Sequence, residues 1–238
     1  MSAALVELDN VIKPYGGLRP LRFRHLIVRE GDRVGIAGVD QTTAEVFVNL
    51  VTGATVPEQG VVRVFGRATT DIADSTDWLA TVDRFGIVSE RVVLLEQYSL
   101  AQNIAMSLTL DLDPLSDAVR KDVAALGGEV GLSTDDLARS AQESGAALRQ
   151  RARLARAIAT GPSTLLVEHP AAGLTSEEVL RLAADLARVA EARRLAVIVL
   201  SASADLGRPF VERLLILNAA SGELTEERRG VLKRLFGG

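Results

Sequence analysis

The 238 residues of this chain, 47% apolar and 24% charged, suffice for one large domain with a packed core, and this composition excludes wholesale disorder. The absence of cysteine excludes disulfides, thiolate metal sites and cysteine nucleophiles. A net charge of −4 disfavours a nucleic-acid partner. Apolar stretches such as Leu195 to Leu200 are far shorter than the roughly 20 residues of a membrane span, and the first residues carry no secretory signal. We therefore expect a soluble, cytoplasmic protein that does not insert into a membrane.

Short apolar segments separated by glycines predict strands in the first third of the chain. One such strand ends at Gly38, and the helix that follows it stops before Gly53. We expect strands at 5–8, 21–29, 33–37, 61–65 and 85–88, and a helix at 44–51.

The middle and the last third of the chain have different patterns. Helical spacing runs from 100 to about 158, with breaks at Pro114, the Gly127-Gly128 pair and Gly145. Continuous apolar strands then alternate with helices, which is typical of a parallel sheet covered on both faces. We expect strands at 164–167, 195–200 and 214–217, and helices at 176–193 and 225–235.

A strand, a turn that opens at Gly38 and a helix ending in residues 49–53 form the frame of a phosphate-binding loop. Further landmarks are Tyr15-Gly16-Gly17, the run from Gly53 to Gly66, and residues 154–157 and 165–174. With these landmarks in this order, the chain resembles the nucleotide-binding domain of an ATP-binding cassette (ABC) transporter over nearly its whole length.

The resemblance implies an α/β fold of the P-loop NTPase type, with a mostly parallel sheet that has helices on both faces. It further implies an N-terminal antiparallel β subdomain and an inserted helical subdomain. We expect a single domain over 1–238, in which about 1–89 and 155–238 form the core and the β subdomain, and about 90–154 the helical subdomain.

The phosphate loop departs from the pattern of that family. Such a loop needs glycines whose backbone N–H groups wrap the phosphates, a lysine on the terminal phosphates and a hydroxyl for Mg²⁺. Aligned by its flanking glycines, the chain has Ala44 at the lysine position and Glu45 at the hydroxyl position. The resemblance places the nucleotide-pocket equivalents at Tyr15, Gly38, Asp40, Gln41, Thr42, Thr43, Ala44, Glu45, Val46, Glu90 and Glu168.

The other motif positions of the family also differ. Glu90 stands in place of a glutamine, Glu168 of the magnesium-binding aspartate, His169 of the catalytic glutamate and Ala202 of the switch histidine. The signature equivalents are Ser144, Gly145, Ala146, Ala147 and Leu148, without the family's serine and glycine pair. Positioning and electrostatics supply nearly all of phosphoryl-transfer catalysis. We therefore assign no catalytic residue and expect ATP hydrolysis to be absent or very weak, although the family implies ATP and Mg²⁺.

In the implied fold, Glu45, Glu90 and Glu168 surround the position that Mg²⁺ takes in the family. Like charges in a partly buried site cannot all ionise without compensation. Three solutions are open, namely a bound divalent cation on these oxygen ligands, raised pKa values, or neutralising arginines from elsewhere in the fold. A fourth interpretation is an abandoned pocket whose glutamates are solvated.

Other singled-out residues each have two interpretations. His169 could orient a water as a base, or be a hydrogen-bonded residue at the end of a buried strand. Tyr15 could stack on a base, or pack at the domain edge. Arg149, Arg153 and Arg156 share one helical face, which is either solvated or faces a dimer partner.

We favour a degenerate ABC-type subunit that binds partners or regulates a membrane transport complex. Its expected partners are another ABC-type domain, in a homo- or heterodimer, and an integral membrane permease, so that it lies on the inner face of the membrane. Two alternatives stay open, a weak ATPase that uses Glu168 and His169 with unorthodox phosphate contacts, and a dimeric scaffold unrelated to transport.

Overall fold

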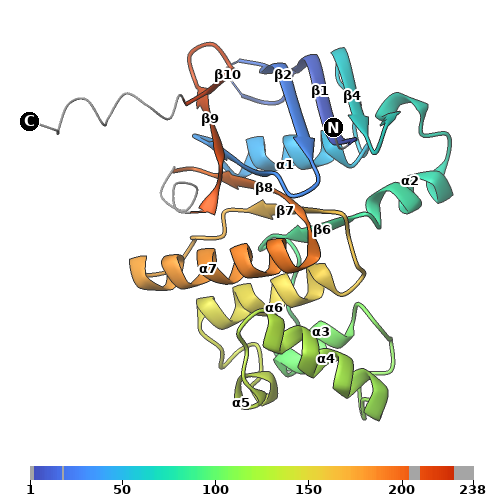
Figure 1. The fold of residues 1–238 in the computed structure, drawn as a ribbon, viewed down its shortest axis with the longest axis vertical. Coiled ribbons are helices and arrows are strands. Elements are labelled where there is room, and N and C mark those ends of the chain that lie inside the picture. Colours follow the sequence, from blue (N-terminus) through green and yellow to red (C-terminus); the bar gives the residue numbers. More distant parts are fainter. Residues whose placement is uncertain (1–2, 18, 204–209, 228–238) are drawn as a thin grey trace, which may run out of the picture.

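The computed structural model describes residues 3–17, 19–203 and 210–227 (Figure 1). In these residues the strands form one ten-stranded sheet in the order β5-β4-β1-β2-β10-β9-β3-β8-β7-β6. The strands are β1 (Ala4–Lys13), β2 (Leu21–Arg29), β3 (Arg33–Ala37), β4 (Gln59–Val64), β5 (Arg67–Ala68), β6 (Phe85–Val88), β7 (Thr164–Glu168), β8 (Ala196–Ser201), β9 (Arg213–Asn218) and β10 (Glu223–Glu226).

The sheet has a parallel half and an antiparallel half. Strands β9, β3, β8, β7 and β6 are parallel to one another, whereas β5, β4, β1 and β2 pair antiparallel. Strand β10 joins the halves, since it lies antiparallel to β9 and pairs parallel with β2 at Glu223 and Arg22. The carboxyl ends of β3, β7 and β6 therefore meet at one edge, where ligands of open α/β sheets bind.

Helices cover both faces of the sheet. They are α1 (Gln41–Val51), α2 (Ser75–Val82), α3 (Leu100–Ala105), α4 (Asp117–Glu129), α5 (Thr134–Ala138), α6 (Ala146–Ile158) and α7 (Ser176–Arg193), with a 3₁₀ turn at Thr69–Asp71. Figure 1 shows α6 and α7 on the side of β7 and β6 that faces away from α1. None of the described helices is both long and apolar enough to cross a bilayer.

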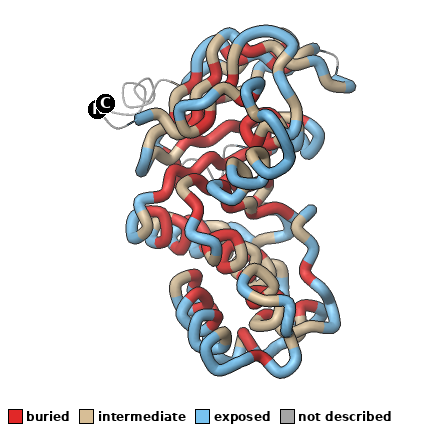
Figure 2. The backbone as a smooth tube through the Cα atoms, turned by 90° about the vertical axis from the view of Figure 1, so that its right-hand side faces the viewer, coloured by how far each residue is buried: buried red, intermediate tan, exposed pale blue. Residues whose placement is uncertain are grey.

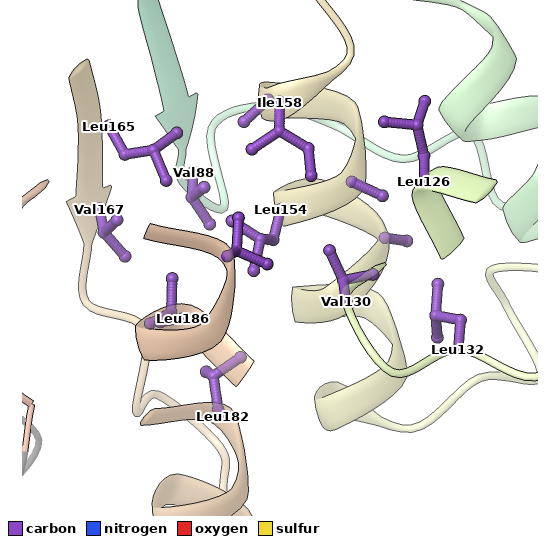
Figure 3. Packing of buried hydrophobic residues seen from close by; sticks show 14 of the residues in the cluster. Val88, Leu126, Val130, Leu132, Leu154, Ile158, Leu165, Val167, Leu182 and Leu186 are labelled. Carbon is purple, nitrogen blue, oxygen red and sulfur yellow. The ribbon is translucent and has the colours of Figure 1, made fainter. Parts of the chain in front are cut away.

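Alternation along the central strands produces two cores. Leu165 and Val167 pack beside α6 and α7 (Figure 3), Val197 and Val199 belong to the same core cluster, and the intervening Leu166 and Ile198 belong to the cluster that contains residues of α1. Successive residues of a strand point to opposite faces of the sheet. A strand that is covered on both faces therefore needs a continuous run of apolar residues.

Helices α3 and α4 pack against each other and against α6, α5 packs against α3 and α4, and we call α3–α6 the helical region. Leu126, Val130 and Leu132 belong to the same core cluster as Leu154 and Ile158 of α6, and Figure 3 shows Leu126 and Leu132 across α6 from Leu165 and Val167. Figure 2 shows the buried segments on the inner sides of these helices and the exposed segments in the outer loops.

The predicted α/β fold is confirmed, although several elements differ, among them α1, which begins at Gln41 rather than at 44. Helix α2 was not predicted, and none of its residues is buried. The helix predicted at 225–235 is wrong at its start, because Glu223–Glu226 form strand β10, which pairs with β9; residues 228–235 lie outside the described part of the chain.

Candidate functional site

The turn after β3 is built as a phosphate-loop frame requires. Gly38 has a φ of +79°, and a Cβ there would lie 3.1 Å from the carbonyl oxygen of Leu217. Only glycine adopts that conformation without strain and leaves room for the neighbouring strand. The chain therefore leaves β3 in the direction that brings the next residues to the edge of the sheet.

The segment that follows is helix rather than a wrapped loop. Helix α1 begins at Gln41, and Asp40 is its N-cap. The Asp40 carboxylate accepts the Thr43 N–H at 2.7 Å, and the Asp40 carbonyl accepts the Ala44 N–H at 2.9 Å. Two backbone donors in the stretch where a phosphate loop would wrap its ligand are thus used inside the chain.

Asp40 places its own anion at the positive end of α1. The backbone N–H of Thr43, as the largest cause, and the Thr43 side chain lower the pKa of the Asp40 carboxyl, and the nearby His169 side chain lowers it further. The side chain therefore carries its negative charge where the family holds phosphate.

The residues after the cap divide between the core and the surface. Ala44, at the lysine position, is fully buried in the core on the α1 face of the sheet. Thr43 is also buried, and its hydroxyl donates to the Tyr15 hydroxyl at 3.1 Å. Thr42 and Glu45 are exposed, and Val46 is half-buried.

Tyr15 packs against the same core and bonds the first turn of α1, which matches the edge-packing interpretation.

The carboxylate of Glu168, at the end of β7, is buried and fully hydrogen-bonded. Its Oε2 accepts the Gln41 amide at 3.1 Å, the Ser89 hydroxyl at 2.9 Å and Arg91 Nε at 3.1 Å. Its Oε1 accepts Arg91 Nη2. Donors from α1, from the end of β6 and from the next loop therefore converge on one carboxylate, which is what a buried charge needs.

Arg91 supplies the cation of the site. Its side chain is 38% exposed, whereas that of Glu168 is 1% exposed. Arg91 Nη1 also lies 3.4 Å from Glu45 Oε1. Bonding to Glu168 raises the pKa of the Arg91 guanidinium further above its already high value. Sequence reasoning did not name Arg91, although it left open that an arginine neutralises these glutamates.

The structure does not bring together Glu45, Glu90 and Glu168, the residues of the predicted cation site. The described residues contain no group of three or more His, Asp or Glu side chains placed to hold a metal ion. Arg91 lies between Glu45 and Glu168, and the charge of Glu90 acts on Arg153 of α6. These residues do not fit a bound Mg²⁺, because a guanidinium occupies the space between the carboxylates.

His169 and Ala202 lie at the same edge of the sheet. His169 has a φ of +44°, its N–H donates to the Leu200 carbonyl at 2.8 Å, and its carbonyl accepts the Ala172 N–H. Its Nε2 is buried and has no hydrogen-bond partner among the described residues. Ala202 is exposed just after β8. The backbone bonds of His169 fit a structural residue at a strand end.

The signature equivalents form the start of α6. Ser144 is buried and its hydroxyl donates to the Ser140 carbonyl at 2.8 Å, while Gly145 is the N-cap, without a side-chain bond to the helix. Ala146, Ala147 and Leu148 are half-buried in the first turn. The helix N-terminus is therefore retained although the family's glycine pair is not.

The arginine face of α6 is not simply a solvated surface. Arg153 Nε donates to the Val92 carbonyl at 3.3 Å, and Arg156 Nη1 to the Val93 carbonyl at 2.9 Å. Burial lowers the pKa of both guanidinium groups. Their role is thus to hold the loop after β6 against α6.

Proteins of known function match nearly the whole chain. It is 29% identical over 227 residues to the methionine import ATP-binding protein MetN of Brucella abortus, covering 95% of this chain and 60% of that protein. It is 30% identical over 239 residues to MetN of Caulobacter vibrioides, covering 98% and 68%. The chain thus spans about 60–70% of the length of these relatives. No protein-family model matches it.

Solved structures share the fold. A dimeric ATP-binding cassette in a post-hydrolysis state with ADP and phosphate has a TM-score of 0.77 at 24% identity, covering 95% of this chain and 100% of that one. CbiO1 of Clostridium perfringens, part of the ABC transporter complex cbiONQ, has a TM-score of 0.79 at 15% identity, covering 93% and 87%. On its identity to MetN over nearly its full length, the chain belongs to the family of ABC transporter ATP-binding proteins.

Proposed function

We propose that this chain is a catalytically impaired member of that family, which acts as a partner-binding or regulatory subunit of a membrane import complex. The observation that carries the proposal is the start of α1 at Gln41 under the Asp40 cap. The Thr43 N–H bonds the Asp40 carboxylate and the Ala44 N–H bonds the Asp40 carbonyl, so backbone donors that the family gives to phosphate are used within this chain.

Two further observations support the loss of nucleotide chemistry. Ala44 is buried and brings no positive charge to the site. Arg91 is bound to Glu168, the residue at the magnesium-binding position, so a metal ion and its phosphates would have to displace an ion pair. Without the lysine and the metal, the site lacks the two groups that the resemblance assigns to stabilising the charge of a phosphoryl-transfer transition state.

The relatives support the cellular role. Those that match over nearly the whole chain are import ATP-binding proteins, and a solved neighbour is part of an ABC transporter complex. Another neighbour forms a dimer. We therefore propose that this chain pairs with a second ABC-type domain and binds a permease on the cytoplasmic face of the membrane.

Affinity isolation of the tagged chain from detergent-solubilised membranes tests this role. We expect an integral membrane permease to co-purify, together with a second ABC-type domain or a second copy of the chain. Isolation without a membrane protein would contradict the transport role and favour a scaffold.

A turnover assay on the same purified chain tests the impairment. We expect no release of phosphate from Mg²⁺-ATP above that of the Glu168→Gln variant. Turnover that Glu168→Gln abolishes would contradict the proposal and support the weak ATPase.

A further inference from the structure

Residues 89–99, here called the connector, join strand β6 of the sheet to helix α3 of the helical region. The sequence 89–99 has no strand or helix of its own. Its later part makes backbone bonds to the neighbouring segment, since the carbonyls of Glu96 and Tyr98 accept the N–H groups of Gln142 and Ala141, and its earlier part depends on side chains of neighbouring elements.

The first part of the connector is held to the sheet by charge. Ser89 is 1% exposed, and its hydroxyl donates to Glu168 and accepts the Arg91 N–H at 3.2 Å. Arg91 binds both oxygens of Glu168 and lies beside Glu45 of α1. We call Arg91 with Glu45 and Glu168 the Arg91 ion bridge. It links the connector to β7 and α1 at once.

The remaining connector is held to the helical region. Arg153 and Arg156 of α6 donate to the carbonyls of Val92 and Val93. Farther along, Asn103 of α3 is fully buried and bonds both the N–H and the carbonyl of Leu95, at 2.7 and 3.0 Å. The helical region therefore holds the connector by several hydrogen bonds. On the other side, Arg91 is the charged residue that binds the connector to the end of β7.

We propose that Arg91 is a built-in cation that fixes the connector, and with it the near end of the helical region, to the edge of the sheet without any bound ligand. A two-point guanidinium–carboxylate pair has a fixed geometry, and burial of Glu168 strengthens it. The inference rests on the proposed function in one respect, since a Mg²⁺-nucleotide at Glu168 would compete with Arg91.

Amide hydrogen exchange measured by NMR tests the proposal on the whole chain. We expect Arg91→Gln to speed exchange of the Arg91 and Val92 amides about tenfold or more, because their local opening no longer breaks an ion pair. The Leu95 and Tyr98 amides should change less, since Asn103 holds that part of the connector. Amides of α7 that exchange by local opening should keep their wild-type rate, and only those that exchange through global unfolding should speed up with the loss of global stability.

Two further variants keep the test sharp. Arg120→Gln removes the guanidinium of an exposed ion pair with Asp117 and should leave connector exchange unchanged. Arg91→Lys keeps the charge but cannot bind both oxygens, so it should give exchange between wild type and Arg91→Gln; it also serves if Arg91→Gln does not fold. In the wild type, Mg²⁺ and ATP should leave connector exchange unchanged.

Unchanged connector exchange in Arg91→Gln would overturn the proposal, and so would an equal rise over the whole chain, which would reduce Arg91 to a contributor to global stability. Faster connector exchange in the wild type on addition of Mg²⁺-ATP would overturn the claim that the Arg91 ion bridge holds the connector without a ligand. ATP that binds while the connector stays protected would contradict the proposed function and leave the ion bridge standing.

Discussion

Arg91 binds both carboxylate oxygens of Glu168 across the ends of the adjacent parallel strands β6 and β7. Glu168 is almost completely buried and Arg91 reaches solvent, so the pair neutralises a charge that the fold would otherwise have to bury alone. The Arg91 guanidinium thus lies where the resemblance to the ABC family predicts a metal ion.

Loss of Arg91 should destabilise the fold because Glu168 stays buried without its counter-charge. We expect Arg91→Gln to lower the free energy of unfolding by about 2–3 kcal/mol, less than for a pair buried on both sides because Ser89 and Gln41 still donate to Glu168. Urea denaturation of Arg91→Gln, Glu168→Gln and the double variant measures this. A double variant that loses the full sum of the single losses would show that the two residues are not coupled.

Removal of the Asp40 cap should cost helix stability in a pH-dependent manner. We expect Asp40→Ala to lower the free energy of unfolding by about 1 kcal/mol at neutral pH, while Asp40→Asn keeps most of the cap. The pKa of Asp40 is lower in the folded chain than its ordinary value of 3.8. The charged cap therefore stabilises the fold above that ordinary value, and its contribution is lost as the pH falls through the lowered pKa.

Denaturation of Asp40→Ala and wild type at neutral pH and at pH values below about 4 checks the sign. The difference between them should shrink toward acid. A difference that grows toward acid would contradict the assigned role of the carboxylate.

Restoring the family's lysine at position 44 should destabilise the fold and should not restore ATP binding. Ala44 is fully buried among apolar side chains, so Ala44→Lys would bury an unpaired ammonium and should lower the free energy of unfolding by about 3 kcal/mol or more. Thr42→Lys, at an exposed position of the same turn, should change it by less than about 1 kcal/mol. Thermal melts of both variants measure the difference, and a stable Ala44→Lys that binds ATP would show that α1 can reopen into a phosphate loop.

Divalent cations should not stabilise the chain. A site filled at 100 times its Kd would add about 2.7 kcal/mol and raise the Tm by about 5–10 °C. We expect no such rise with Mg²⁺ or Ca²⁺, because Arg91 separates Glu45 from Glu168. A clear rise that Glu168→Gln removes would instead establish a cation site on these carboxylates.

The fold was predictable where its elements are buried. Strands β7 and β8 are covered on both faces and read as continuous apolar runs, so their sequence pattern is unambiguous. Helix α2 buries none of its residues, and β10 is a short polar strand, Glu-Leu-Thr-Glu, at the junction of the sheet. Surface elements of this kind depend on their neighbours in space and leave little trace in apolar periodicity.

The site was predictable in position and not in its contacts. The flanking glycines located Ala44 and Glu45 along the chain, and the match of residues 165–174 located Glu168. The cap at Asp40 could have been found, because aspartate directly before a glycine-free helical stretch is a start signal. Arg91 could not be assigned, because its partners come from β7 and α1, and only the pairing of β6 with β7 brings them together.

Titration calorimetry of the purified chain with ATP, in Mg²⁺ and in chelator, tests the central claim most directly. The Asp40 cap, buried Ala44 and the Arg91–Glu168 pair predict no binding heat at millimolar ATP in either condition. Micromolar, Mg²⁺-dependent binding that Glu168→Gln weakens would contradict the account, since it would require Arg91 to release Glu168 to a metal ion.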